Sequence, residues 1–183
     1  MVLDKRFSLD HKVLYMRLLS RVMGVHKLCV LSFYSYILKS APIPLYSYAL
    51  ITQHRYLTYH QLQITSILVC LAQSVHDLTP PDVLTPTIRK IANEFVHPGV
   101  ASEVIAAGLN SIREVCRRQP WCMEQDLLGD LVEYKKSRDK GVMVASRSLL
   151  QLYRDVNPGM LKKRDRVSVL ELSVNGALTF LLG

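Results

Sequence analysis

The chain has 183 residues, of which 49% are hydrophobic and 21% are charged, so a disordered chain is excluded. This length allows one domain or a run of about four or five helix pairs. The net charge of +8 indicates an anionic partner or a nuclear address. The four cysteines have no CxxC spacing and are typical of small buried side chains in a reducing compartment.

Neither a secretory signal nor a membrane span is predicted. The first ten residues are charged and lack the apolar core of a signal peptide. Between Leu28 and Gln53 only Lys39 is charged, but Pro42 and Pro44 interrupt this apolar run. Neither half reaches the roughly 20 apolar residues that a bilayer requires, so we expect no membrane partner.

Seven segments have the apolar spacing or the turn-bounded length of helices. Gly24 is placed to end the first of them, and Asp139 is placed to cap the last. Pro86 lies inside the fourth and predicts either a kink or a helix that begins at Thr85. The predicted helices are Leu9–Met23, His26–Lys39, Tyr59–Val75, Pro80–Val96, Gly99–Arg118, Met123–Lys136 and Lys140–Asp155.

Two segments lack this pattern. Ser40–Arg55 contains two prolines, no acidic residue and no clear period, and Val167–Gly183 has a single charge. We expect neither to join a helix stack, so the predicted helical-repeat region is 5–166, interrupted at 40–55, followed by an atypical tail at 167–183. No strand is predicted before Val167, because no run alternates apolar and polar residues between turn signals.

The helix Lys140–Asp155 repeats an earlier one at a distance of 37 residues. Its cap and apolar positions, Asp139, Val142, Ala145, Leu149 and Leu152, have counterparts at Ser102, Ile105, Gly108, Ile112 and Val115. A period in the high thirties, built on a helix pair with a small residue in the second helix, is typical of HEAT and armadillo repeats. The sequence therefore predicts an all-α solenoid of this type, in which Val142, Ala145, Leu149 and Leu152 are buried together.

The sequence contains few residue patterns that indicate a catalytic or metal-binding site. Cys116 and His97 both stand at helix ends without a third residue to orient them. The carboxylates of Glu124, Asp126, Asp130 and Glu133 are predicted to lie on a solvated helix face. Dinucleotide, P-loop and nucleophile-elbow motifs are missing, and the histidines have no metal-ligand spacing. We predict a protein that is not an enzyme and takes no cofactor, metal or small-molecule substrate.

Positive charge is concentrated in two clusters near the end of the repeat region. The candidate binding residues are Lys135, Lys136, Arg138 and Lys140 in one turn, and Lys162, Lys163, Arg164 and Arg166 after the next helix. One interpretation is a solvated edge that complements helix dipoles. The other is an edge that contacts phosphates without reading bases, because no aromatic residues are interleaved with the cations.

The segment from Asp139 to Arg166, D-K-G-V-M-V-A-S-R-S-L-L-Q-L-Y-R-D-V-N-P-G-M-L-K-K-R-D-R, resembles the signature end of the SDA family, named for "severe depolymerization of actin". The motif P-P-D-V-L at Pro80–Leu84 and the motif I-A-N-E-F-V at Ile91–Val96 are similar to that family in the same order. So is the opening L-L-S-R-V-M-G-V-H-K-L at Leu18–Leu28.

This resemblance implies a nuclear and nucleolar assembly factor that binds preribosomal particles and is needed for the large ribosomal subunit to mature and leave the nucleus. The implied partners are ribosomal proteins, assembly factors and the backbone of ribosomal RNA. The alternative is a protein-only helical-repeat adaptor in nuclear transport or actin organisation. Family members are much longer, so we expect this chain to be one segment, with 40–55 and 167–183 as products of the gene model.

Overall fold

The computed structural model describes residues 8–38 and 63–166, and all regular structure within these ranges is helical. The expectations for 40–55 and 167–183 lie outside the described residues. The helices are α1 (Leu9–His26), α2 (Leu31–Leu38), α3 (Ile64–Ser74), α4 (Pro81–Phe95), α5 (Ser102–Arg118), η1 (Pro120–Cys122), α6 (Gln125–Glu133), η2 (Tyr134–Lys136), α7 (Lys140–Val156), η3 (Pro158–Met160) and α8 (Lys163–Arg166).

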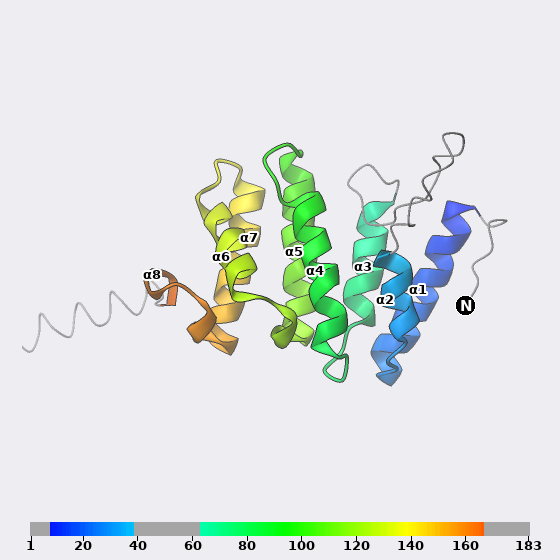
Figure 1. The fold of residues 1–183 in the computed structure, drawn as a ribbon. Helices are drawn as coiled ribbons and strands as arrows, with labels where there is room; N and C mark the ends of the chain where they lie inside the picture. Colours follow the sequence, from blue (N-terminus) through cyan, green and yellow to red (C-terminus); the bar gives the residue numbers. More distant parts are fainter. Residues whose placement is uncertain (1–7, 39–62, 167–183) are drawn as a thin grey trace, which may run out of the picture.

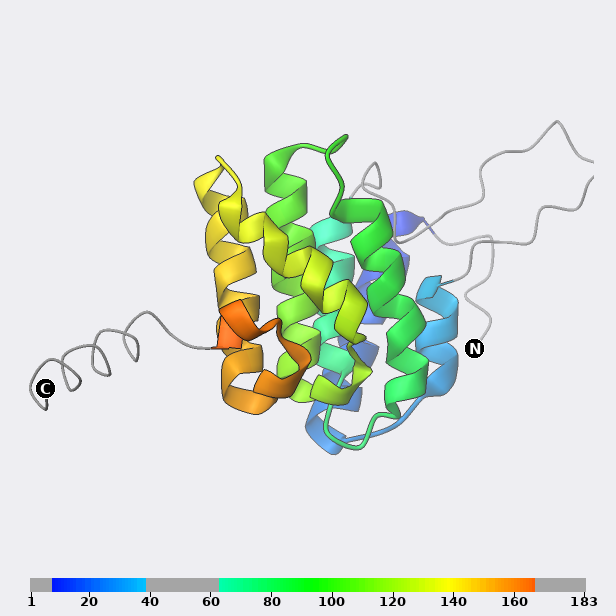
Figure 2. The same ribbon diagram turned by 60° about the vertical axis from the view of Figure 1, so that its left-hand side comes forward.

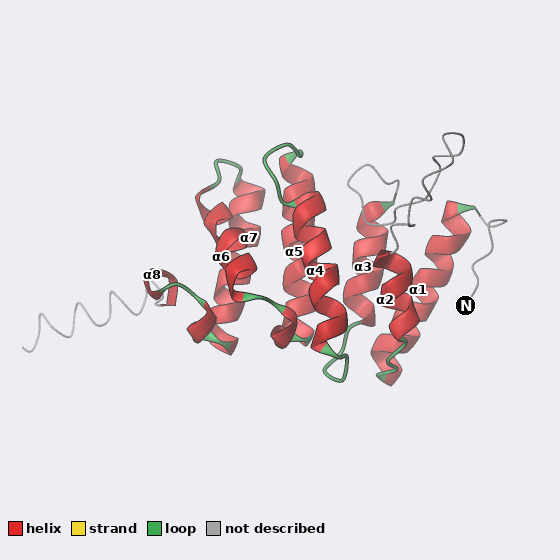
Figure 3. Ribbon diagram, viewed as in Figure 1, coloured by secondary structure: helices red, strands yellow, loops and turns green. Residues whose placement is uncertain are grey.

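The helices form two layers. Helices α1, α3, α5 and α7 lie side by side in one row, and α2, α4 and α6 cover that row in a second (Figures 1 and 3). Helices α4 and α5 form one packed antiparallel pair, and α6 and α7 form the next (Figure 2). This arrangement confirms the predicted all-α helical repeat.

Hydrogen bonds from side chains to backbone carbonyls join one helix pair to the next. The Thr85 hydroxyl donates to the Cys122 carbonyl at 3.1 Å, and the Tyr134 hydroxyl donates to the Val96 carbonyl at 3.1 Å. Each of these two bonds contributes on the order of 1 kcal/mol, and each partner would be left unpaired by separation of the pairs. Within the α4–α5 pair, the Gln119 amide after α5 donates to the Thr79 carbonyl before α4 at 2.7 Å.

The buried face of α7 follows the predicted spacing for three of its four residues. Val142, Ala145 and Leu149 are all buried, with at most 2% of their surface exposed. Leu152 is only half-buried, so its predicted burial is wrong. Tyr153 is fully buried instead, and its hydroxyl donates to the Pro120 carbonyl at 2.9 Å.

Small residues allow close helix packing at two places. A Cβ atom built on Gly108 would lie 2.7 Å from the Cβ atom of Phe95, so only glycine allows α5 to approach α4 this closely. Gly24 has the same role between α1 and α3, because a Cβ there would overlap the Gln73 carbonyl oxygen. The prediction that Gly24 ends the first helix is wrong, because Gly24 lies inside α1.

The first helix instead ends at His26 and is followed by Lys27, whose φ of 51° is left-handed. The Leu28 amide donates to the Met23 carbonyl at 3.0 Å, which closes the helix end in the manner of a Schellman motif. This turn also moves the start of α2 to Leu31, five residues later than predicted. Helix α3 begins at Ile64, and its predicted start at Tyr59 lies outside the described residues. The other helix starts and ends that can be compared agree to within three residues.

Pro86 does not divide α4, which runs without interruption from Pro81 to Phe95. The hydroxyl of the preceding residue, Thr85, lies 3.1 Å from the Pro81 carbonyl one turn earlier as well as from the Cys122 carbonyl, and its one proton is shared between them. Pro86 itself is exposed, so its ring points away from the core. Of the two predicted alternatives, a helix that begins at Thr85 is therefore excluded.

Candidate functional site

The first basic cluster surrounds the connection between α6 and α7. Lys135 and Lys136 form most of η2, Arg138 lies in the following turn, and Lys140 begins α7. Asp139 caps that helix, because its carboxylate accepts a hydrogen bond from the Val142 amide at 3.1 Å. This amide and the Ser102 hydroxyl hold the pKa of Asp139 below its usual value, so the cap stays negatively charged among the cations.

The second cluster comprises Lys162 and three residues of α8, which follows α7 after the turn at η3. A helix of 17 residues is about 25 Å long, so this turn lies at the opposite end of α7 from the first cluster. The chain then returns towards α6, and Figure 2 shows this segment in orange. Leu161 is buried, and the Arg154 side chain donates to the Asp165 carbonyl at 2.7 Å, so α8 is anchored to the core and to α7.

Two carboxylates join the clusters. Glu133, at the end of α6, forms ion pairs with Lys136 at 3.2 Å, with Lys162 at 3.4 Å and with Arg164. The hydrogen bond from Lys136, followed by the charge of Arg164, holds the pKa of Glu133 below its usual value. One surface therefore contains cations from both clusters, because Glu133 pairs with Lys136 of the first cluster and with Lys162 and Arg164 of the second.

The second joining carboxylate is Asp165, which is only 5% exposed. It forms an ion pair with Lys135 of the first cluster and another with Arg164 at 3.5 Å. This role of Glu133 and Asp165 was not predicted from the sequence, where Glu133 was expected on a solvated helix face. The sequence does show one acidic residue next to each basic run, Glu133 and Asp165. Sequence spacing alone does not predict which cation each of them contacts.

The eight candidate cations therefore differ in their availability. Lys135 is half-buried in its ion pair, and Arg166 donates to the Leu161 carbonyl at 2.9 Å. Arg138, Lys140 and Lys163 are exposed and have no acidic partner among the residues that the structure describes. We call these eight cations, with Glu133 and Asp165, the composite basic surface.

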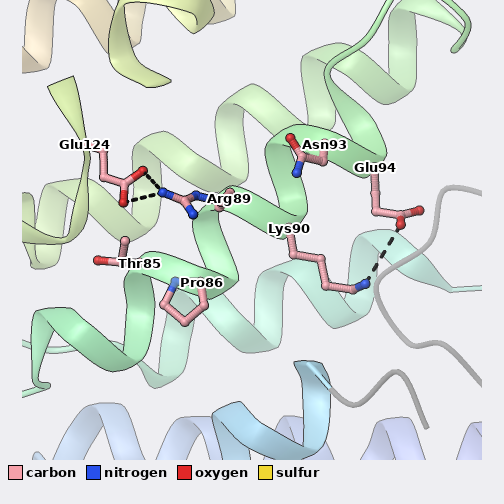
Figure 4. Close-up of a pocket in the computed structure, with 7 residues that line it drawn as sticks. All are labelled: Thr85, Pro86, Arg89, Lys90, Asn93, Glu94 and Glu124. Carbon is pink, nitrogen blue, oxygen red and sulfur yellow. Dashed lines mark hydrogen bonds and ion pairs between the residues drawn. The ribbon is translucent and has the colours of Figure 1, made fainter. Parts of the chain in front are cut away.

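A polar hollow of about 380 Å³ lies over α4 and the start of α6 (Figure 4). Arg89 donates to both carboxylate oxygens of Glu124, at 2.7 and 2.5 Å, and Lys90 lies 3.9 Å from Glu94. Both cations thus face carboxylates within the hollow. Its lining residues are Thr85, Pro86, Arg89, Lys90, Asn93, Glu94 and Glu124.

Cys116 and His97, the two residues considered for nucleophilic chemistry, lie in different places and take part in local packing and turn contacts. Cys116 is fully buried beside Cys122, and its hydrogen bond together with burial raises the pKa of the Cys122 thiol. The His97 ring accepts a hydrogen bond from the Gly99 amide at 3.2 Å in the turn between α4 and α5. Within 8–38 and 63–166, no group of three or more His, Cys, Asp and Glu is arranged to hold a metal ion, and no helix has the length and hydrophobicity to span a membrane.

The two helical rows and their repeated pairs define a HEAT-type helical-repeat protein. Residues 2–138 match the family described as "SDA1, HEAT repeat". The chain belongs to this SDA1 family.

Named relatives support this assignment over most of the chain. Protein sda1 of Schizosaccharomyces pombe is 53% identical over 88% of this chain, and Protein SDA1 of Chaetomium thermophilum is 51% identical over 90%. The Protein SDA1 homolog of Nematostella vectensis is 44% identical over 85%. These alignments cover 20%, 19% and 20% of the relatives, so this chain spans about a fifth of their length.

Proposed function

We propose that this chain is a non-catalytic scaffold that binds preribosomal particles in the nucleus and nucleolus and serves the maturation and nuclear export of the large ribosomal subunit. Its membership of the SDA1 family supports this proposal. The observation that carries it is the composite basic surface, because a phosphate-rich particle offers a complementary negative charge.

Phosphates would first contact the cations that have no acidic partner on this surface. These are Arg138 and Lys140, at the connection from α6 to α7, and Lys163, at the start of α8. Lysine and arginine contacts to phosphate provide affinity and position a protein on RNA, but they do not read sequence. We therefore propose that the surface binds the backbone of ribosomal RNA within a particle whose proteins supply the specificity.

A scaffold role also agrees with the surroundings of Arg89 and Cys116, the reactive side chains of the polar hollow and of the buried cysteine pair. In the polar hollow, Arg89 is held by Glu124. The Cys116 thiol is buried and offers no access to a substrate. A protein of this kind acts by the shape and charge of its surface, as solenoids commonly do.

One observation favours the alternative of a protein-only adaptor in nuclear transport or actin organisation. Glu133 and Asp165 already neutralise part of the composite basic surface. A surface whose cations chiefly hold α8 in place would need no nucleic acid. The two functions predict different dependence of RNA binding on salt.

The test compares the full chain with two variants of equal charge. The double variant Lys140→Glu, Lys163→Glu changes cations that are outside the ion pairs, and Arg17→Glu, Arg21→Glu changes exposed cations on α1. Binding to polyuridylate is measured over a series of salt concentrations, and each single-strand phosphate contact contributes about 0.7 to the slope of log K against log salt.

We expect the first variant to weaken binding and to flatten the slope by about 1.4, corresponding to two lost contacts. The α1 variant keeps the parental slope if binding is local to the composite basic surface. Failure of the parent chain to bind at low salt would support the adaptor. Equal effects of both variants would mean that the RNA responds to net charge alone.

A further inference from the structure

Helix α1 lies at one end of the described row of helices (Figure 1). It carries a row of exposed apolar side chains. Their spacing of four, four and three residues places them along one side of the helix. The opposite side holds Val13, Met16 and Met23, which are buried in the contact with α3. The exposed residues, here called the α1 stripe, are Leu14, Leu18, Val22 and Val25, with 59%, 64%, 36% and 77% of their surface exposed.

Apolar residues on two opposite sides are typical of a helix that packs between two others. Helix α5 has this environment, because α3 and α7 both contact it. Helix α7 lies at the other end of the described row, and its exposed side is more polar, with Arg147, Gln151 and Asp155 beside Val144. Terminal repeats require a polar outer face for solubility. By this criterion α1 has the composition of an internal helix.

The borders of the α1 stripe define the charge of its partner. Arg17 and Arg21 are exposed one turn apart beside the stripe, and Asp10 is the only acidic residue of α1. Two copies packed stripe to stripe would bring four arginines to one interface. A helix with Asp or Glu beside its apolar side would meet these arginines with opposite charge.

We propose that the α1 stripe is the packing surface for a further amphipathic helix of the longer SDA1 polypeptide, which continues the row formed by α1, α3, α5 and α7. The relatives provide ample chain for such a helix, because this sequence spans about a fifth of their length. This inference goes beyond RNA or particle binding, because it concerns how the repeat region joins the rest of the protein.

The experiment uses the full 183-residue chain and the parts of the Schizosaccharomyces pombe relative that lie outside the matched region, produced as separate polypeptides. Complex formation is measured by light scattering after size-exclusion chromatography and by calorimetric titration. The variant Leu18→Glu places a charge at the centre of the stripe. The matched control is Leu78→Glu, which changes a leucine of similar exposure, 65%, between α3 and α4.

We expect one of these polypeptides to bind the parent chain and the Leu78→Glu control equally. The Leu18→Glu variant should bind at least about tenfold more weakly, because an unpaired charge is costly in an apolar contact. Arg17→Glu, Arg21→Glu should also weaken binding. Circular dichroism confirms that each variant remains helical.

Two results would overturn the proposal. In the first, no flanking polypeptide binds, or Leu18→Glu binds as tightly as the parent. In the second, the parent chain forms a dimer that Leu18→Glu dissociates, which would assign the stripe to a second copy. Neither result depends on RNA binding, so the proposed function is tested separately.

Discussion

Replacement of Gly24 by alanine is expected to destabilise the fold, although alanine is the better helix former. A Cβ at this position would lie closer to the Gln73 carbonyl oxygen than the 3.0 Å that real Cβ atoms observe. Because that oxygen belongs to the backbone of α3, the helices themselves must separate. Such overpacking destabilises proteins by about 1–3 kcal/mol.

Gly129 provides the matched control. It also lies inside a helix, but the nearest atom to an added Cβ is the Cε of Lys162 at 3.6 Å, an ordinary contact with a flexible side chain. Gly129→Ala should therefore stabilise the protein by about 0.5–1 kcal/mol, which is the helix propensity difference. Both variants share this propensity gain, so the difference between them isolates the overpacking at Gly24.

The free energy of unfolding of the three proteins is measured by urea denaturation with circular dichroism. We expect Gly24→Ala to be less stable than Gly129→Ala by about 1–3 kcal/mol. For a chain of this size the corresponding difference in Tm is roughly 2–12 °C. If Gly24→Ala is as stable as Gly129→Ala, then α1 and α3 are not in close backbone contact at Gly24.

Two further predictions concern the core and the joining carboxylates. Leu149→Ala should destabilise the protein by about 2–5 kcal/mol because Leu149 is fully buried, whereas Leu152→Ala should have less than half that effect in the same denaturation assay. Because its ion pairs lower the folded-state pKa of Glu133 below 4.5, their contribution is present above that pH and is lost as the pH falls through the lowered value. The parent should therefore be more stable than Glu133→Gln at neutral pH, and the difference should shrink below pH 4.5; a difference independent of pH would contradict this.

Helix caps and apolar spacing predicted the second half of the fold well. The Asp139 carboxylate caps α7 as expected, and the helix ends within one residue of the predicted position. Both features depend on contacts within four residues of each other in the sequence. Local signals of this kind are read directly from the sequence.

Positions that depend on contacts across the fold were predicted less well. Gly24 was interpreted as a local helix terminator, but the Gln73 backbone explains it. Leu152 was expected to be buried because its spacing puts it on one helix face with Val142, Ala145 and Leu149. Its counterpart 37 residues earlier, Val115, is indeed buried. Val115 lies on α5, between α3 and α7, whereas among the described helices α7 has its row neighbour on one side only. The repeat predicts the register of a residue but not whether a neighbour covers it.

On the composite basic surface, too, the contacts between distant parts of the chain were not predicted from the sequence. All eight cations could be picked out from the sequence, but the turns at the two ends of α7 lie far apart, and the clusters are joined only because α8 returns to α6. This return places Lys135 beside the nearly buried carboxylate of Asp165. A cation in such a pair also stabilises the fold, because its removal would leave the buried carboxylate without a partner. Mutation of Lys135 would therefore confound loss of binding with loss of structure, and Lys140 and Lys163 are the cations at which charge can be changed to test binding alone.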